Sequence, residues 1–446
     1  MNDQLNTNRL SKLLPLIFTL QALGLLILLK SVTLSALFYL MLLLPVIVYI
    51  SPEIGVLFVA TGNVLLYVLF DQLQLNIPAP VMIAHVLFLT LTILVIHVKY
   101  PDRRIPLDTV FYLTLALWFV LVLGVLYSDN RMYGMLKIVF FLVINLYAFF
   151  ACLFLAYDRV KLKKFVISVW GIGFLLAFFA YIQPKSYLFE YVRYTVSESV
   201  NPIFLSRSLG ISAVAGLYFA FRSRLLVFKV IYLVTLPLLI GPMIWTMSRG
   251  PLLGLLLSFL LYYLLQPSRP RWERAIVTLA GIGAALIFLV TSAGQIQQRM
   301  VTPIGEETSA AFRILAWIQA LQDFAGSPLL GIGTGSFFMD TPWVPFIYPH
   351  NLVLEVLCEN GIIGLGLLTA FLLLAWRRGI KALKSATSQG DIQLIITLLC
   401  MFAFALFNAL FSGDIYKNEM IWVTAGLLVA LYYTFSAHEK TVVDNL

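Results

Sequence analysis

Charged residues are scarce in this chain of 446 residues, where Asp, Glu, Lys and Arg together make up only 11% of the sequence. Ordinary soluble domains carry roughly 25% charged residues. Hydrophobic residues make up 61% of the chain, and a soluble fold of this length has too little polar surface to cover them. The composition therefore excludes water-soluble proteins and indicates an integral membrane protein.

Cysteine and histidine are also rare, with three and four residues respectively. Cys152, Cys358 and Cys400 form an odd set without metal-ligand spacing, so no disulfide framework or metal site is expected from them. We also expect no bound cofactor. The net charge is +9, but the basic residues sit in short clusters and form no continuous stripe with stacking aromatics. This distribution argues against nucleic acid as a partner.

The apolar residues are arranged in runs of about 18–22, the length that crosses the hydrocarbon core of a bilayer. Such spans must be helical, because lipid offers the backbone no hydrogen-bond partners. We therefore predict an all-α polytopic membrane protein with about 12–14 transmembrane helices. The candidate spans lie near residues 13–30, 32–50, 54–70, 79–98, 107–127, 135–157, 163–183, 204–221, 225–247, 250–266, 274–292, 351–376, 391–411 and 419–436.

The basic residues predict the orientation of these spans, because cytoplasmic loops are enriched in Lys and Arg. Alternate loops carry clusters near residues 99–104, 159–164, 222–229, 269–274 and 377–384. With Arg9, Lys12 and Lys440, that side holds 20 of the 30 basic residues. We expect it to be cytoplasmic, with both termini there. No small-residue cleavage site follows Arg9 and Lys12, which predicts an uncleaved first span.

Residues 293–350 form the longest polar segment, and the charge pattern places it in the periplasm or its equivalent. Within it, residues 308–324 have apolar side chains at helical spacing, which predicts an amphipathic helix near the membrane interface. A shorter outer loop covers residues 184–203. We find no internal repeat, so transporter architectures built from duplicated halves are disfavoured.

Three arginines stand near membrane depth on the predicted outer side: Arg207, Arg249 and Arg313. Charged groups are costly there unless they pair or function. A guanidinium group grips phosphate oxygens through paired hydrogen bonds and keeps its proton. The three residues therefore suggest a site for an anionic headgroup such as a lipid diphosphate. The alternative is that each arginine only anchors its helix at the interface.

His350 lies where the large outer loop re-enters the membrane, in Tyr348-Pro349-His350-Asn351. A neutral imidazole at this position could accept the proton of a hydroxyl nucleophile. A helix-capping or structural role is the alternative. Glu355 and Glu359 follow with i, i+4 spacing and share a helix face. They could orient His350 or a bound sugar, or they could line a hydrated vestibule.

The glycine-rich segment at residues 330–337 superficially resembles a nucleotide-binding loop. No strand precedes it, and the lysine that such a loop needs is absent. It also lies on the predicted side of the membrane that has no ATP. We therefore expect a flexible turn that lets the outer loop pack close to the bilayer.

Several motifs follow one another along the second half of the chain. The sequence has His350-Asn351, then nine residues, then the stretch Gly361-Ile362-Ile363-Gly364. Upstream, Arg313 and Trp317 precede the stretch at residues 327–335, and Ser248-Arg249-Gly250 forms an earlier arginine turn. Together these motifs resemble those of the bacterial O-antigen ligase and O-antigen polymerase superfamily. The resemblance covers roughly residues 200–420.

The resemblance implies an inverting membrane glycosyltransferase on the outer face of the inner membrane, with a glycan on undecaprenyl diphosphate as donor. It implies no metal and no nucleotide sugar. Arg249 and Arg313 would hold the diphosphate, and His350 would activate the acceptor hydroxyl or assist departure of the diphosphate. Residues 201–436 would form the catalytic membrane domain, preceded by a bundle at 1–200 and followed by a cytoplasmic tail at 437–446. The expected further substrate-binding residues are Arg207, Asn351, Tyr348 and Glu355.

Some alternatives stay open at this point. The acceptor is either lipid A core, as for a ligase, or another carrier-linked glycan, as for a polymerase. A chain-length regulator is a candidate partner. A polysaccharide transporter or flippase would instead predict ionisable residues near mid-span and pseudo-symmetric halves. A structural membrane protein would give no reason for His350 and the arginines to gather around one outer loop.

Overall fold

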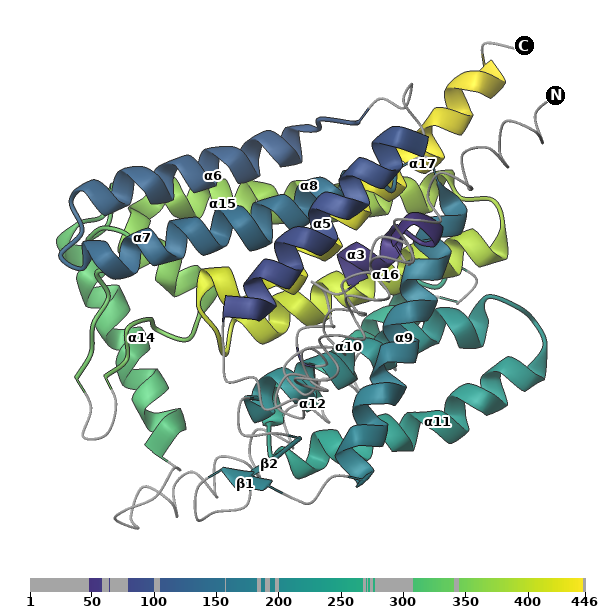
Figure 1. The fold of residues 1–446 in the computed structure, drawn as a ribbon, viewed down its shortest axis with the longest axis horizontal. Helices are drawn as coiled ribbons and strands as arrows, with labels where there is room; N and C mark the ends of the chain where they lie inside the picture. Colours follow the sequence, from purple (N-terminus) through teal and green to yellow (C-terminus); the bar gives the residue numbers. More distant parts are fainter. Residues whose placement is uncertain are drawn as a thin grey trace, which may run out of the picture.

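The protein is seen in a computed structural model that describes residues 48–57, 64, 79–99, 105–156, 158–182, 186–188, 193–196, 200–267, 270, 272, 276, 308–340 and 345–443. This part of the chain is a bundle of helices (Figure 1). The helices are α3 (Glu53–Leu57), α5 (Ala79–Lys99), α6 (Thr109–Leu126), α7 (Arg131–Phe140), the π-helix η2 (Phe141–Leu146), α8 (Tyr147–Leu153), α9 (Arg159–Ile182), α10 (Pro202–Phe221), α11 (Leu226–Trp245), α12 (Arg249–Leu264), α14 (Thr308–Gly326), α15 (Leu352–Ser385), α16 (Gln389–Ala409), the 3₁₀ turn η3 (Ile415–Lys417) and α17 (Glu419–Val443).

Seven of these helical stretches are long and apolar enough to cross a membrane, counted over the described residues. They are α6, the continuous stretch α7–η2–α8, α9, α10, α11, α15 and α16. Shorter apolar helices include α12 and the first part of α17. The predicted all-helical, multi-span fold class is confirmed. The candidate spans near 13–30, 32–50, 54–70 and 274–292 lie wholly or largely outside the described residues, so the predicted total of spans stays a prediction.

Polar side chains set where several of the spans begin. The Asp108 carboxylate accepts a hydrogen bond from the backbone N–H of Val110 at 2.9 Å at the start of α6. Asn201 caps α10, and Pro202 follows at a position where the helix needs no N–H donor. Ser388 caps α16 in the same way. Such residues satisfy backbone donors that lipid could not satisfy.

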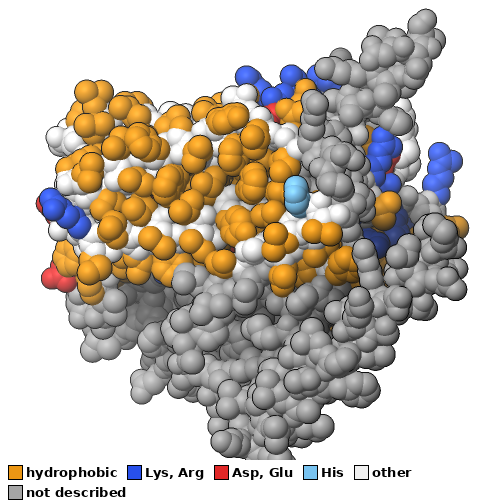
Figure 2. Space-filling view, turned by 45° about the horizontal axis from the view of Figure 1, so that its top comes forward, with side chains coloured by type: hydrophobic (Ala, Val, Ile, Leu, Met, Phe, Trp, Pro, Cys, Tyr) orange, Lys and Arg blue, Asp and Glu red, His pale blue; other side chains and the backbone are white. Residues whose placement is uncertain are grey.

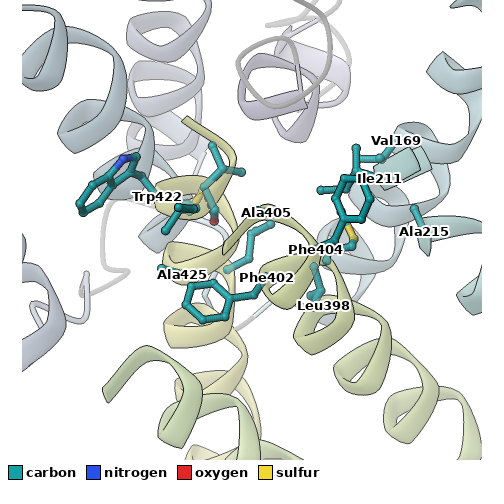
Figure 3. Packing of buried hydrophobic residues seen from close by; sticks show 14 of the residues in the cluster. Val169, Ile211, Ala215, Leu398, Phe402, Phe404, Ala405, Trp422 and Ala425 are labelled. Carbon is teal, nitrogen blue, oxygen red and sulfur yellow. Dashed lines mark hydrogen bonds between the residues drawn. The ribbon is translucent and has the colours of Figure 1, made fainter. Parts of the chain in front are cut away.

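The core lies where α9, α10, α15, α16 and α17 pack together, and it consists almost entirely of aliphatic and aromatic side chains. In Figure 3 the Phe402 and Phe404 rings of α16 point in different directions, Phe402 toward the side of Trp422 and Phe404 toward Ile211. Gly210 lets the Phe404 ring approach α10, since an added Cβ would lie 2.5 Å from it. Close packing of this kind fixes the helices that carry the site.

The outer surface of the bundle is also apolar. Figure 2 shows one face on which hydrophobic side chains form a continuous surface, with charged side chains toward its two ends. On α6, for example, Tyr112, Phe119 and Leu126 are more than half exposed. A continuous apolar surface of this size is unusual on a soluble monomer and suits contact with lipid.

The two ends of the bundle differ in charge chemistry. At one end, basic residues pair with carboxylates that start helices: Arg378 contacts Asp108 at 2.8 Å, and Lys163 contacts Asp391 at 2.8 Å. The opposite end holds the turn between α6 and α7, the start of α10, the segment before α15 and the turn between α16 and α17. The candidate site residues gather at that opposite end.

A small hairpin was not expected from the sequence. Within the predicted outer loop 184–203, β1 (Ser186–Leu188) pairs antiparallel with β2 (Arg193–Thr195). Tyr194 of β2 is buried and its ring lies 5.6 Å from the ring of Trp245 at the end of α11. The hairpin therefore forms part of the packing at the same end of the bundle as the candidate site.

Candidate functional site

The described part of the predicted outer segment begins with α14, and the predicted helix over residues 308–324 is confirmed as Thr308–Gly326. Ala316 and Ala320 are buried and pack in a small cluster with Phe337 and Cys358. The indole Nε1 of Trp317 donates a hydrogen bond to the carbonyl of Pro349 at 3.1 Å. These contacts fix α14, which carries Arg313, against the segment that carries His350. Figure 1 shows α14 at the end of the bundle where α6 turns into α7.

The helix α15 is broken near its start, and the glycine-rich segment fills the break. Gly361 has φ 62° and ψ −162°, a conformation that only glycine adopts readily. The carbonyls of Cys358 and Glu359 accept hydrogen bonds from Ile332 at 2.9 Å and Gly333 at 3.0 Å. The backbone groups released by the break are thereby satisfied, as they must be near the membrane.

The glycines of this segment serve close packing. Gly331, Gly333 and Gly335 all have positive φ. An added Cβ at Gly335 would lie 2.6 Å from the backbone nitrogen of Gly134 in α7. The expected flexible turn is therefore corrected to a tightly packed one, wedged between α7 and the broken α15. The conformational freedom of glycine was predicted correctly, but it serves fit rather than motion.

His350 is held in an unusual local structure. Its φ is 57°, a left-handed conformation that is uncommon for residues other than glycine. The imidazole ring centroid lies 4.7 Å from that of Phe346 and 4.3 Å from that of Tyr348. The Nδ1 atom is buried and has no hydrogen-bond partner in the described part of the chain. A strained backbone at such a position is a reason to consider function.

Burial and positive charge keep the imidazole neutral. Burial lowers the pKa of His350 most, followed by the charges of Arg313, Lys417 and Arg207, and the result is a pKa of about 3. Burial also raises the pKa of the neighbouring Tyr348 phenol to about 12. At neutral pH the imidazole of His350 is therefore uncharged, and its Nδ1 can accept or donate a hydrogen bond. The Tyr348 phenol keeps its proton.

The helix-capping role considered for His350 belongs instead to Asn351. The Asn351 side-chain oxygen accepts hydrogen bonds from the backbone nitrogens of Val353 at 3.0 Å and Leu354 at 3.1 Å. This is the N-cap of α15. Asn351 thus fixes the position of the preceding residue, and its role as a substrate ligand stays a prediction.

The structure gives the three predicted arginines different surroundings. Arg207 donates to the carbonyls of Asn408 at 2.6 Å and Ser412 at 2.8 Å, so it closes the end of α16. Arg313, on α14, is the cation with the largest effect on His350. Arg249 begins α12 at the same end of the bundle but is not among the cations that lower the pKa of His350. Arg313 and Arg207 are therefore near enough to affect the charge of the imidazole, and a role of Arg249 beside them stays a prediction.

A buried cluster of charged residues joins α7, the start of α15 and the turn before η3. It was not predicted from the sequence. Lys137 of α7 is fully buried, and its Nζ lies 2.8 Å from a carboxylate oxygen of Glu355 and 2.8 Å from one of Glu359. Asp414, in the turn before η3, is 3.6 Å from the same nitrogen. The Tyr133 hydroxyl donates to Asp414, and the backbone N–H of Ile415 donates to Glu355 at 3.2 Å.

This cluster changes the view of the two glutamates. Glu355 is 1% exposed, so in this structure its contacts are made with Lys137 and the 414–415 backbone rather than at the surface. Its predicted contact with substrate stays a prediction. A lone lysine in an apolar run was the available signal for the cluster, because intramembrane charges are rare unless they pair or function.

These features define a class of protein: a multi-span helical membrane protein with a neutral histidine among cations at one end of its bundle. Residues 234–369 match the family described as O-antigen ligase. The segment includes Arg249, Arg313 and His350. The predicted family resemblance is thus confirmed.

The chain is also similar to a protein of Pseudomonas aeruginosa named O-antigen ligase. The two are 28% identical over 249 residues. The alignment covers 52% of this chain and 55% of that relative, so the chain matches about half of the relative's length.

Proposed function

We propose that the protein is a membrane glycosyltransferase that moves a glycan from undecaprenyl diphosphate to an acceptor hydroxyl on the periplasmic face of a bacterial inner membrane. One observation carries the proposal: a neutral imidazole, whose buried Nδ1 has no hydrogen-bond partner among the described residues, stands among cations at the end of the bundle opposite the paired basic clusters. The match of residues 234–369 to the O-antigen ligase family supports the reaction class.

The proposed chemistry needs a base and a stabilised leaving group. The acceptor hydroxyl is a poor nucleophile and gains from a base within hydrogen-bond reach, for which His350 is the candidate. Negative charge develops on the diphosphate as the glycosidic bond breaks, and fixed cations such as Arg313 and Arg249 stabilise it. The hydroxyl oxygen attacks the anomeric carbon from the face opposite the diphosphate, so the configuration inverts.

Binding of the donor also changes the basicity of His350. In the structure the surrounding cations oppose protonation of the imidazole. A bound diphosphate offsets those charges and therefore raises the pKa of His350 toward its ordinary value. The imidazole becomes an effective proton acceptor when the donor is in place, and the acquired proton then has the departing diphosphate as its destination.

The acceptor decides between two versions of the function. Transfer to lipid A core makes the protein a ligase, and transfer to another carrier-linked glycan makes it a polymerase, for which a chain-length regulator is a candidate partner. The transporter alternative predicts ionisable groups near mid-span. The buried ion cluster instead lies behind His350 at one end, since Lys137 is joined there to the first turn of α15.

The test is replacement of His350 in a strain that lacks the chromosomal gene. We expect His350→Ala to abolish glycan transfer while the protein still inserts into the membrane. His97→Ala is the control and should stay active, because His97 is exposed near the C-terminal end of α5. Gel analysis of surface glycans is the measurement. Uncapped core with carrier-linked polymer accumulating indicates a ligase, and core bearing one repeat indicates a polymerase. Near-normal glycans with well-expressed His350→Ala would remove His350 from the mechanism.

A further inference from the structure

We infer that Lys417 is a further cationic ligand for the diphosphate group of the lipid-linked donor. The inference rests on the proposed function and concerns the same site. Lys417 lies outside the segment that matches the O-antigen ligase family, which ends at residue 369. It is the last residue of η3, in the turn that joins α16 to α17.

The position of Lys417 brings its charge next to the imidazole. Its Nζ lies 5.4 Å from the ring centroid of Tyr348 and 5.4 Å from that of Tyr416. The Tyr348 ring is in turn 4.3 Å, centroid to centroid, from the ring of His350. The Tyr348 ring is therefore a common neighbour of the ammonium group and the imidazole. The charge of Lys417 affects His350 more than that of Arg207 does.

Unlike the basic residues at the opposite end, Lys417 has no carboxylate partner among the residues that the structure describes. Arg378 and Lys163 are both paired with acids there. Lys417 forms no ion pair with any carboxylate in the described part of the chain, and its side chain is half-buried. A half-buried cation without a counter-ion favours the binding of an anion, because the anion supplies the missing charge.

The turn that carries Lys417 is held in place from several sides. The Lys417 backbone N–H donates to the carbonyl of Asp414 at 2.9 Å. Asp414 belongs to the buried cluster around Lys137. Asn418 accepts a hydrogen bond from Arg207 at 3.2 Å and donates to the Asp414 carbonyl at 2.9 Å. The lysine therefore extends from a fixed base, and such preorganised charge is what stabilises a diphosphate most effectively.

The contacts that Arg207 makes within the protein explain why a further cation would help to bind the diphosphate. The guanidinium of Arg207 makes three contacts within the protein, to Asn408, Ser412 and Asn418. These contacts leave it a positive charge but reduce the donors it can offer to a ligand. A lysine ammonium has three donors and acts as a point charge. Lys417 can therefore contact one phosphoryl group while Arg313 contacts the donor from α14.

The experiment uses the full-length protein in lipid nanodiscs and measures transfer and diphosphate binding separately. We expect Lys417→Ala to raise the KM for the lipid-linked donor by about 10–100-fold, the range for loss of a charged hydrogen bond. Lys417→Arg should retain affinity within about threefold, because it keeps the charge. Lys384→Ala is the matched control, since Lys384 is an exposed lysine in the last turn of α15, at the opposite end. Lys384→Ala should leave both the KM for the donor and the binding of diphosphate unchanged.

Inorganic pyrophosphate provides a readout that does not depend on turnover. Its binding, followed by fluorescence of Trp317 beside the site, should weaken in Lys417→Ala by a factor similar to the donor KM. Equal pyrophosphate affinity in wild type and Lys417→Ala would overturn the inference. A change only in the acceptor KM would overturn it too. Failure of the proposed function has a different signature, because full transfer by His350→Ala would be seen whatever Lys417 does.

Discussion

At the residue scale, His350 combines a left-handed backbone, a buried Nδ1 without a hydrogen-bond partner among the described residues, and a strongly lowered pKa of about 3. These features have a cost that depends on pH. Between pH 6.5 and pH 3 the unfolded chain binds a proton at this residue and the folded protein does not. The free energy of unfolding therefore decreases as the pH falls through this window, and His350 has no such effect above pH 6.5.

We expect this cost in thermal unfolding of the purified protein in detergent. On going from pH 7.5 to pH 5, the apparent Tm of wild type should fall by more than that of His350→Gln, which has no group that titrates there. The glutamine variant provides the control for all other titrating groups. Parallel decreases in the two proteins would contradict the described environment of the imidazole.

Most of the candidate site residues were predicted where a local motif marked them, whereas Arg207 was predicted from its place at the start of a span. His350, Arg313 and Arg249 stand in recognisable stretches, and all three lie at the same end of the bundle. Lys137 and Lys417 have no such motif. Lys137 finds its partners 218 and 222 residues later in the chain, at Glu355 and Glu359. A pairing over that separation is a property of the packed bundle and leaves no local pattern.

At the element scale, the spans were predicted closely because apolar runs end at capping residues and charged clusters. The run at 107–127 becomes α6 (Thr109–Leu126), and that at 391–411 becomes α16 (Gln389–Ala409). The break in α15 and the hairpin β1–β2 were not predicted. The break depends on the glycine-rich segment, which supplies hydrogen bonds to the carbonyls of Cys358 and Glu359 from outside the helix.

Two glycines of α15 provide a matched test of this break. Gly361→Ala places a Cβ 2.2 Å from the carbonyl oxygen of Leu329 at a residue with φ 62°. We expect Gly361→Ala to lower the free energy of unfolding by about 1–3 kcal/mol. It should also reduce glycan transfer, because the segment before the break carries His350. Gly366→Ala meets no atom within 4 Å and has ordinary helical φ.

The measurement is the apparent Tm of each variant in detergent together with glycan transfer in cells. Gly366→Ala should equal or exceed wild type, because alanine favours helix by about 1 kcal/mol over glycine. If Gly361→Ala unfolded at the wild-type temperature, the break would not be the fixed feature described here.

At the scale of the whole molecule, the distribution of basic residues between the two ends of the bundle predicts its orientation in the membrane. Paired basic residues gather at the end where α15 and α17 finish, and His350 lies at the other. By the enrichment of Lys and Arg in cytoplasmic loops, we propose that the His350 end faces the periplasm. The same rule predicted this arrangement from the sequence.

Cysteine labelling tests the orientation in cells with a permeabilised outer membrane. A membrane-impermeant maleimide should label Asp129→Cys, in the exposed turn between α6 and α7, while the inner membrane is intact. Thr387→Cys, in the exposed turn between α15 and α16, should react only after that membrane is disrupted. The three native cysteines are buried and give little background. The reverse pattern would invert the proposed orientation.

The ion cluster around Lys137 has a consequence for biogenesis. The lysine leaves the ribosome long before its counter-ions, since Glu355 follows 218 residues later. At bacterial rates of synthesis this interval is roughly 10–45 s. During that time the nascent chain must hold an uncompensated ammonium group in or beside the bilayer. The first-made helices therefore reach their final arrangement only after the carboxylates on α15 have been translated, so a truncated chain would lack the charges that tie its early part to its late part.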